Sequence, residues 1–245
     1  MRTVFLELGK GLADVFFPPT CLHCGEIVEE DAPLRCLCMR CRREVRLVEA
    51  PFCSCCGHPF FGEVDGERVC PHCDGLRAVF GGGRTAVLFK GPARSLILEL
   101  KYRRGLRVLG DIGRIFSEAN PVLEWVRGGV LVPVPLHARK LRERGYNQTQ
   151  LIAEALALAA GGGTRVFPLL RRVIDTPSQT AFDRRARLAN LKGVFALERG
   201  ASVGSGLRLI LVDDVFTTGS TLNRCAQALL DAGAERVDVV TFAHG

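Results

Sequence analysis

Two adjacent carboxylates follow directly after an apolar run near the C-terminal end of the chain. Asp213 and Asp214 come after Leu209–Val212, and a short loop of hydroxyl residues with one glycine leads into a helix-like segment. Carboxylates suit the hydroxyls of ribose and a divalent metal, and backbone N–H groups at a helix start suit a phosphate. The pattern predicts a sugar-phosphate site, and a capped strand–turn–helix without a ligand is the alternative.

Cysteines form the second group of residues that could do chemistry. Eight of the eleven form four Cys-x-x-Cys pairs, and thirteen residues separate the pairs in each half: Cys21/Cys24 and Cys38/Cys41, then Cys53/Cys56 and Cys70/Cys73. Each turn points two thiolates at one place, and two turns complete a tetrahedral zinc shell. The repeated spacing predicts two closed structural zinc sites with sequential pairing. An interleaved arrangement, in which the first pair meets the third, is the alternative.

Disulfides or free thiols are the other interpretation of these cysteines. The N-terminal stretch Val4–Phe17 has helical spacing and charged residues, and it predicts an amphipathic helix rather than a signal peptide. We therefore expect a cytoplasmic protein, in which disulfides are rare. Cys36 and Cys55 lie beside the pairs and leave the ligand assignment open, whereas Cys225 is expected to be a small core residue.

Charge is distributed unevenly along the chain, which has a formal net charge of +7. Residues 1–80 carry nine Lys/Arg against twelve Asp/Glu, and residues 81–245 carry twenty-four against fourteen. The excess of basic residues lies in the part that holds the acidic pair, and it favours a small phosphorylated ligand or nucleic acid. A solvated, arginine-rich surface is the alternative. We expect two domains, residues 1–80 and 81–245.

Beyond residue 84, short apolar runs alternate with helical segments. Strands are expected at 85–89, 129–133, 208–212 and 236–242, and helices at 93–102, 107–120, 148–160 and about 220–232, with Gly233 as a left-handed cap. This alternation predicts an α/β fold with a parallel sheet and helices on both faces. Ligands of such sheets bind at the carboxyl ends of the strands. Neighbouring strand residues face opposite ways, so both carboxylates reach one ribose only if the strand turns at Asp214.

Residues 209–221 resemble the phosphoribosyl pyrophosphate (PRPP) motif of type I phosphoribosyltransferases. The resemblance covers nearly the whole chain, and further segments narrow it to the ComF family. These segments are the cysteine pairs, Leu100-Lys101-Tyr102, Leu131-Val132-Pro133-Val134-Pro135-Leu136-His137 running on to Gln148, and Thr176-Pro177-Ser178-Gln179 with Arg184, Arg187, Asn190 and Phe195. The resemblance implies a type I phosphoribosyltransferase-like parallel sheet with flanking helices, preceded by a small N-terminal double zinc ribbon.

The resemblance also implies roles for individual residues. The 5′-phosphate of PRPP would lie in the loop Thr217, Thr218, Gly219, Ser220 and Thr221, and Asp213 and Asp214 would hold the ribose hydroxyls and magnesium. A pyrophosphate loop is implied at Val134, Pro135, Leu136 and His137, with Arg142 and Arg144. A hood over the site is implied at Thr176, Gln179, Arg184, Arg187 and Asn190, and Arg184 joins the acidic pair as a catalytic residue.

Some of these assignments leave alternatives open. The hood segment could instead be an exposed basic helix. Asn147 and Gln148 would either bind a substrate or cap the following helix, and Lys101 would either reach the pyrophosphate or remain solvated.

Two functions follow from the resemblance. One is a PRPP-binding protein that acts in DNA uptake, natural transformation or DNA utilisation and binds single-stranded DNA. The other is an active magnesium-dependent phosphoribosyltransferase of nucleotide or nucleoside metabolism, in which an unidentified acceptor displaces pyrophosphate from PRPP. With one Trp and two Tyr in the chain, DNA binding would depend on phosphate contacts more than on base stacking.

Overall fold

The computed structural model describes residues 18–62, 64, 66–173 and 193–245. The predicted N-terminal helix and the hood residues Thr176, Gln179, Arg184, Arg187 and Asn190 lie outside this range. A five-stranded parallel sheet forms the centre, and all of its neighbouring strands run in the same direction. Its order is β1 (Gly83–Leu88), β7 (Val237–His244), β6 (Leu209–Phe216), β2 (Val130–Pro133) and β3 (Arg165–Val166).

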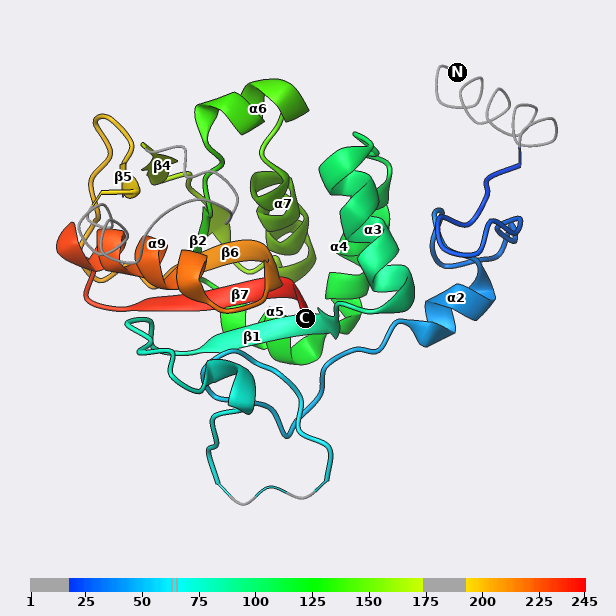
Figure 1. Ribbon diagram of the computed structural model, residues 1–245, viewed down its shortest axis with the longest axis horizontal. Helices are drawn as coiled ribbons and strands as arrows, with labels where there is room; N and C mark the ends of the chain where they lie inside the picture. Colours follow the sequence, from blue (N-terminus) through cyan, green and yellow to red (C-terminus); the bar gives the residue numbers. More distant parts are fainter. Residues whose placement is uncertain (1–17, 63, 65, 174–192) are drawn as a thin grey trace, which may run out of the picture.

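Helices cover both faces of this sheet (Figure 1). One face packs against α3 (Gly91–Tyr102), α4 (Val108–Glu118), α5 (Asn120–Val126) and α7 (Gln148–Ala160). The other face packs against α9 (Ser220–Asp231) and the antiparallel pair β4 (Leu170–Arg172) and β5 (Phe195–Leu197). The predicted α/β architecture is confirmed.

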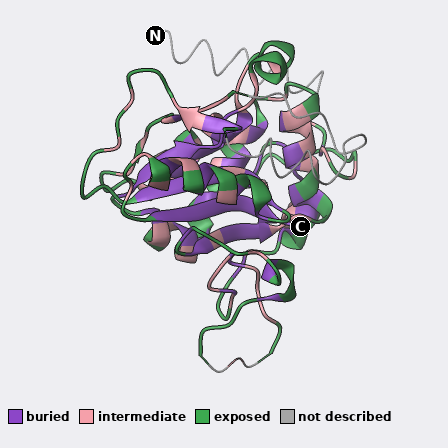
Figure 2. Ribbon diagram, turned by 60° about the vertical axis from the view of Figure 1, so that its left-hand side comes forward, coloured by how far each residue is buried: buried purple, intermediate pink, exposed green. Residues whose placement is uncertain are grey.

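The strands β6 and β7 lie inside the sheet and contribute side chains to a hydrophobic core on each of its faces. Parallel strands that are covered on both faces read as continuous apolar runs, and all eight residues of β7 are buried. Alternate side chains then belong to different cores: Ile210 and Val212 pack toward α3, α4 and α7, whereas Leu209 and Leu211 pack toward α9. Figure 2 shows the buried strands between layers of more exposed helix.

The boundaries of several elements follow from proline and glycine. The predicted helix at 107–120 corresponds to α4, which ends at Glu118, and the sequence did not predict α5. Pro121 lies in the first turn of α5, where a missing N–H costs nothing. After α9, Gly233 has a φ of 98°. Its N–H donates to the Leu230 carbonyl and that of Ala234 to the Leu229 carbonyl, so the predicted left-handed cap is confirmed.

The two cysteine-rich segments contact different parts of this framework. The first ribbon (residues 20–45), which includes α2 (Met39–Glu44), packs beside α3 and α4 (Figure 1). The second ribbon (residues 52–79), which includes the short helix η1 (Pro71–Cys73), lies against β1 and the α9 side of the sheet. Among the helices that the structure describes, none has the length and apolar character needed to cross a membrane.

Candidate functional site

Each ribbon brings four cysteine sulfurs together. The Sγ atoms of Cys21, Cys24, Cys38 and Cys41 all lie within 4.8 Å of one another, and so do those of Cys53, Cys56, Cys70 and Cys73. The sulfurs are 3.6 Å apart in the pair Cys24/Cys38 and 3.5 Å apart in Cys56/Cys70. Tetrahedral zinc with Zn–S bonds of about 2.3 Å separates its sulfurs by about 3.8 Å, whereas a disulfide needs about 2.05 Å. Both clusters therefore fit zinc, and the sequential pairing is confirmed.

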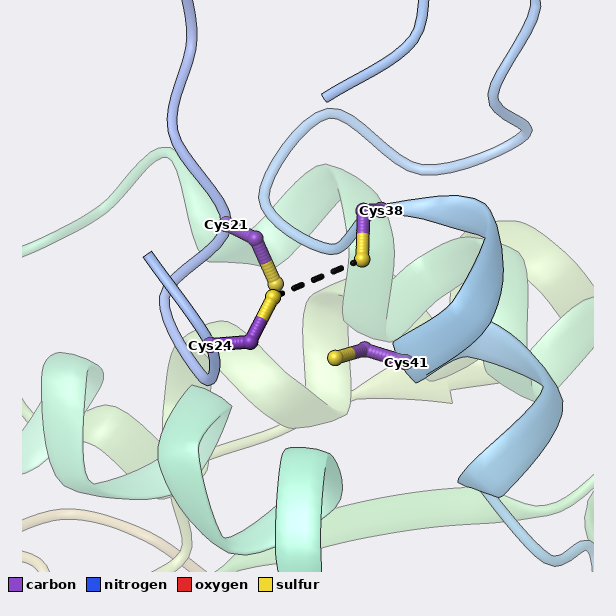
Figure 3. A group of neighbouring side chains, drawn as sticks. All are labelled: Cys21, Cys24, Cys38 and Cys41. Atoms are coloured by element: carbon purple, nitrogen blue, oxygen red, sulfur yellow. Dashed lines mark hydrogen bonds between the residues drawn. The ribbon is translucent and has the colours of Figure 1, made fainter. Parts of the chain in front are cut away.

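Figure 3 shows how the first cluster is built, with the four side chains converging from a turn and from the start of α2. Cys36 and Cys55, which the sequence left open, lie outside both groups of four. The N–H of Cys36 donates to Asp111 Oδ2 at 2.8 Å, and burial together with the Asp111 charge raises the pKa of the Cys36 thiol to about 12. Cys36 therefore stays a protonated thiol at neutral pH. Cys225 is fully buried in α9, as expected of a core residue.

The acidic pair lies on β6, and the strand does not turn at Asp214. It runs on to Phe216 and stays paired with β7 through Val215 and Phe216. The condition under which both carboxylates would reach one ribose is therefore not met by the backbone. Asp213 is half-buried and lines a cleft, whereas Asp214 is buried and bonds to residues of α3 and α7.

Both carboxylate oxygens of Asp214 have partners within the chain. Lys101 Nζ lies 2.8 Å from Oδ1, and Gln148 Nε2 donates to Oδ2 at 2.9 Å. Arg144 in turn donates to the side-chain carbonyl of Gln148. Lys101 is therefore an ion-pair partner rather than a solvated lysine, and Gln148 contacts the acidic pair. Asn147 takes the capping role, because its side chain accepts from the Thr149 N–H at the start of α7.

Asp213 has an unusual proton affinity. Burial, together with the neighbouring charge of Asp214, raises the pKa of Asp213 to about 8, and a hydrogen bond from the Asp214 N–H and the charge of Lys101 only partly offset this. Asp213 Oδ1 accepts that N–H at 2.8 Å. The raised pKa favours the protonated form of Asp213 in the free protein, and a cation or a hydroxyl-rich ligand in the cleft would favour its ionised form.

The cleft beside Asp213 is lined by the end of β6, by the loop after it and by the first turn of α9, from Val215 to Leu222. Thr217, Thr218, Ser220 and Thr221 are exposed there, and Thr218 Oγ1 lies 3.0 Å from Ser220 Oγ. Gly219 precedes α9 with a φ of 68°, a conformation that side chains other than glycine disfavour. The N–H groups of this helix start, with hydroxyls around them, suit a phosphate, although the Ser220 N–H already donates to Thr218 Oγ1 at 3.4 Å.

The segment expected to hold pyrophosphate extends β2 and leads into α6 (Ala138–Arg144). Val134 and Pro135 are buried, Leu136 and His137 are half-buried, and His137 caps α6 by accepting from the Arg139 N–H at 3.3 Å. Arg142 is exposed, whereas Arg144 bonds to Gln148. Of the two predicted arginines, only Arg144 is thus joined to the acidic pair, through Gln148.

The predicted hood residues fall outside the described chain, but the strands before and after them are described. Arg172 at the end of β4 pairs with Phe195 at the start of β5, so the two ends of the intervening segment are held together. A β-bridge between His137 and Arg172 brings β4 next to the start of α6. The flanking strand ends, Arg172 and Phe195, thus lie near the point where β2 leads into α6.

Two family models match the chain. A double zinc ribbon domain matches residues 12–74, and a phosphoribosyl transferase domain matches residues 152–245. The DNA utilization protein YhgH of Salmonella typhimurium is 31% identical over 222 residues, which cover 83% of this chain and 94% of the relative. Competence protein ComFC of Bacillus subtilis is 26% identical over 246 residues, 93% of each chain. Competence protein F of Haemophilus influenzae is 26% identical over 233 residues, 91% of this chain and 96% of the relative.

Solved structures give a weaker likeness. A hypoxanthine phosphoribosyltransferase from Staphylococcus aureus aligns with 54% of this chain and 62% of its own, at 14% identity and a TM-score of 0.36. A glutamine PRPP amidotransferase from B. subtilis aligns with 52% of this chain and 26% of its own, at a TM-score of 0.33.

Proposed function

The chain belongs to the ComF family of competence and DNA utilization proteins, and from this premise we propose that it binds PRPP with magnesium and acts on single-stranded DNA in uptake or utilisation. One observation carries the PRPP part: Asp213 and the hydroxyl loop line the same cleft at the end of β6. The family match places a phosphoribosyl transferase domain over these residues. Both are consistent with a ligand that joins a pentose to phosphates.

The arrangement suggests a division of roles. Thr217–Thr221 would receive the 5′-phosphate, because exposed hydroxyls and helix-start N–H groups surround the cleft. Asp213 would accept hydrogen bonds from the ribose hydroxyls once it is ionised. Asp214 would hold Lys101 and Gln148 in place, and Lys101 and Arg144 would supply positive charge on the pyrophosphate side. Magnesium, when bound, would neutralise phosphate charge with carboxylate and phosphate oxygens as ligands.

The DNA part of the proposal rests on charge next to this cleft. The helix α6 carries Arg139, Lys140, Arg142 and Arg144, and all of its residues are exposed or half-buried. Arg104, two residues beyond the end of α3, donates to the Glu143 carbonyl at 2.7 Å and extends the basic surface. The names of the relatives refer to competence and DNA utilisation, and a basic surface of this kind suits a phosphate backbone.

An active transferase is a second candidate, favoured by the raised pKa of Asp213. Once it is ionised, a carboxylate with a pKa of about 8 is a stronger base than an ordinary carboxylate and would accept a proton from an attacking acceptor. The transferase would release pyrophosphate as the acceptor bonds to the anomeric carbon. Screening bases, nucleosides and single-stranded DNA for PRPP-dependent pyrophosphate release tests this. Turnover with one acceptor class would establish an enzyme, and binding without turnover would leave a PRPP-responsive DNA-binding protein.

Replacing both carboxylates tests the PRPP site. Asp213→Ala/Asp214→Ala should weaken magnesium–PRPP binding more than about 100-fold, because charge-assisted hydrogen bonds and the positioning of Lys101 are lost together. Titration calorimetry measures the Kd. Asp231→Asn is the matched control, because this acidic residue lies at the far end of α9 and bonds to Gln227. A double variant that binds within twofold of wild type would contradict the site.

Proton release gives the same test a second readout. Because the pKa of Asp213 is about 8, ionisation on binding should release close to one proton at pH 7 and almost none at pH 9.5. Affinity should therefore rise between pH 6 and pH 9. Calorimetry in buffers with different ionisation enthalpies counts the protons. Asp213→Asn should release fewer protons than wild type at pH 7, and equal release would assign the proton to another group.

Salt dependence tests the DNA surface. The affinity for a thirty-nucleotide oligo-dT should fall steeply between 50 and 200 mM salt, with a slope of about −0.7 per phosphate contact. Lys140→Gln/Arg142→Gln on α6 should reduce that slope by about 1 to 1.4. Arg43→Gln/Arg46→Gln removes the same charge from exposed positions near the first ribbon and should leave the slope unchanged. Fluorescence anisotropy measures both, and a flat salt response would count against phosphate contacts.

A further inference from the structure

The loop Thr217–Thr221, proposed above to receive the 5′-phosphate and called the phosphate loop from here on, packs closely against the second ribbon. A Cβ placed on Gly219 would lie 2.7 Å from Leu76 Cδ2 and 2.7 Å from the ring of Phe216, so glycine is the residue that this packing admits. Leu76 belongs to the ribbon and Phe216 is the last residue of β6. The loop residue at the N-cap of α9 is therefore held between the sheet and the ribbon.

A side-chain amide provides a second connection between the same two parts. Asn223 lies in the first turn of α9, and its N–H donates to the Gly219 carbonyl at 2.8 Å. Its side chain accepts from the Val79 N–H at 2.7 Å and donates to the Arg77 carbonyl at 3.0 Å. Asn223 thus clamps two backbone groups of the ribbon segment that follows Cys73 to the start of α9.

This ribbon segment is connected directly to the second cysteine cluster. The N–H of Leu76 donates to the Cys73 carbonyl at 3.0 Å, only three residues away. Aromatic rings form a parallel route, since His72 lies 5.0 Å from the buried His244, and His244 stacks on Phe216 at 5.0 Å, both measured between ring centroids. The second cysteine cluster is thus connected to both residues that face Gly219, through the Cys73 carbonyl to Leu76 and through His72 and His244 to Phe216.

We propose that Leu76 and Asn223 are positioning residues that couple the second cysteine cluster to the phosphate loop. Metal loading at Cys53, Cys56, Cys70 and Cys73 and anion binding at Thr217–Thr221 then favour each other. The reason is that an ordered ribbon holds the loop N–H groups in place before the ligand arrives, which removes an ordering cost from binding. Such coupling is reciprocal, so the ligand must also help to retain the metal. The proposal rests on the PRPP function in taking the anion to be a phosphate of PRPP.

The first measurement compares three variants of the full chain in magnesium–PRPP calorimetry. Asn223→Ala and Leu76→Ala should each raise the Kd about tenfold. Gln227→Ala is the matched control, because Gln227 lies one turn further along α9 and bonds to Asp231 at 2.7 Å. Its Kd should stay within twofold of wild type. Equal binding by wild type, Asn223→Ala and Leu76→Ala would overturn the proposal.

The second measurement uses reciprocity, which a merely structural role would not show. Release of the two zinc ions to a zinc-selective chelator should follow two phases in wild type. Saturating magnesium–PRPP should slow one phase several-fold, and this slowing should be lost in Asn223→Ala. Release that PRPP slows equally in wild type and Asn223→Ala would overturn the coupling.

Hydrogen exchange separates failure of this proposal from failure of the PRPP function. In the zinc-loaded protein without ligand, Asn223→Ala should speed amide exchange in residues 217–222 about tenfold and leave β7 unchanged. Leu76→Ala should also speed exchange in this loop, and it replaces Asn223→Ala in the measurement if that variant folds poorly. If wild type fails to bind PRPP but the loop exchanges faster in both variants, the PRPP function is wrong and the positioning role stands. Unchanged exchange in both variants would overturn the positioning role.

Discussion

The two ribbons have the same cysteine spacing but different surroundings. The first packs against helices on one face of the sheet, and the second packs against the phosphate loop on the other face. Because two Cys-x-x-Cys turns supply all four thiolate ligands of a zinc ion, the repeated motif does not indicate where each ribbon attaches to the rest of the fold. What distinguishes the two is the set of residues outside the metal cluster that bind each one to the fold.

The first ribbon is attached by a buried carboxylate. Asp111 on α4 accepts the N–H of Arg35 at 2.9 Å and that of Cys36 at 2.8 Å, and burial raises the pKa of Asp111 above its usual range. Arg42 of α2 also pairs with Glu118 at the end of α4. These contacts lie on the face of the sheet that is covered by α3, α4, α5 and α7, whereas the phosphate loop lies on the face that is covered by α9 (Figure 1).

The second ribbon is attached by close backbone contact. A Cβ on Gly57 would lie 2.7 Å from the Cα of Arg84, and one on Gly83 would lie 2.6 Å from the Cys55 carbonyl oxygen. The guanidinium of Arg84 lies 4.2 Å from the ring centroids of both Phe52 and Trp125. With Leu76 and Asn223 at the other end, this ribbon contacts both β1 and the start of α9, so we expect only this ribbon to influence the ligand site.

The largest difference between the two ribbons is expected when one zinc ligand is removed from each in turn. Cys38→Ser and Cys70→Ser replace equivalent members of the two clusters, and each protein should hold one zinc instead of two by mass spectrometry under native conditions. Structural zinc contributes on the order of 10 kcal/mol to the folding of small zinc fingers. Cys70→Ser should also weaken magnesium–PRPP binding at least tenfold, whereas Cys38→Ser should stay within twofold. Equal loss of binding in both would remove the distinction.

Asp111→Ala should have a smaller effect, confined to stability. It leaves the buried N–H of Cys36 and the partly buried N–H of Arg35 without an acceptor, which should lower the free energy of unfolding in urea by about 2 kcal/mol. Glu118→Ala, on the same helix and facing the same ribbon, removes a partly exposed ion pair and should cost less than about 1 kcal/mol. The Kd for PRPP should be unchanged in both. A loss of PRPP affinity in Asp111→Ala would show that the first ribbon also influences the cleft.

The parts of the fold that the sequence predicted are those determined by local pattern. Apolar runs located β2, β6 and β7, helical spacing located α7 at its observed ends, and cysteine spacing predicted both clusters. The helix α6 was missed, because its seven residues contain four basic side chains and one leucine and so show no apolar face. It forms between two caps, His137 and Gly145.

The contacts that organise the site were beyond prediction, because they join residues far apart in the chain. Asp214 meets Gln148 across 66 positions, and Val79 meets Asn223 across 144. The sequence also does not indicate that β6 continues past Asp214, because apolar residues such as Val215 and Phe216 occur both in strands and in turns that pack against a core. The roles of the hood residues, and the domain boundary at residue 80, stay predictions.

The connection between the ribbons has a practical consequence for anyone who divides this protein. Leu47 forms an antiparallel bridge with Val87, and the Val48 N–H donates to the Ala86 carbonyl at 2.8 Å, so the linker covers the outer side of the edge strand β1. Expression of residues 81–245 alone would expose β1 as an apolar edge strand with unpaired backbone N–H and C=O groups. Strands of other chains can pair with such an edge, which leads to aggregation. We would therefore attribute poor solubility of such a fragment to the uncovered edge of β1 before attributing it to instability of the phosphoribosyltransferase-like half.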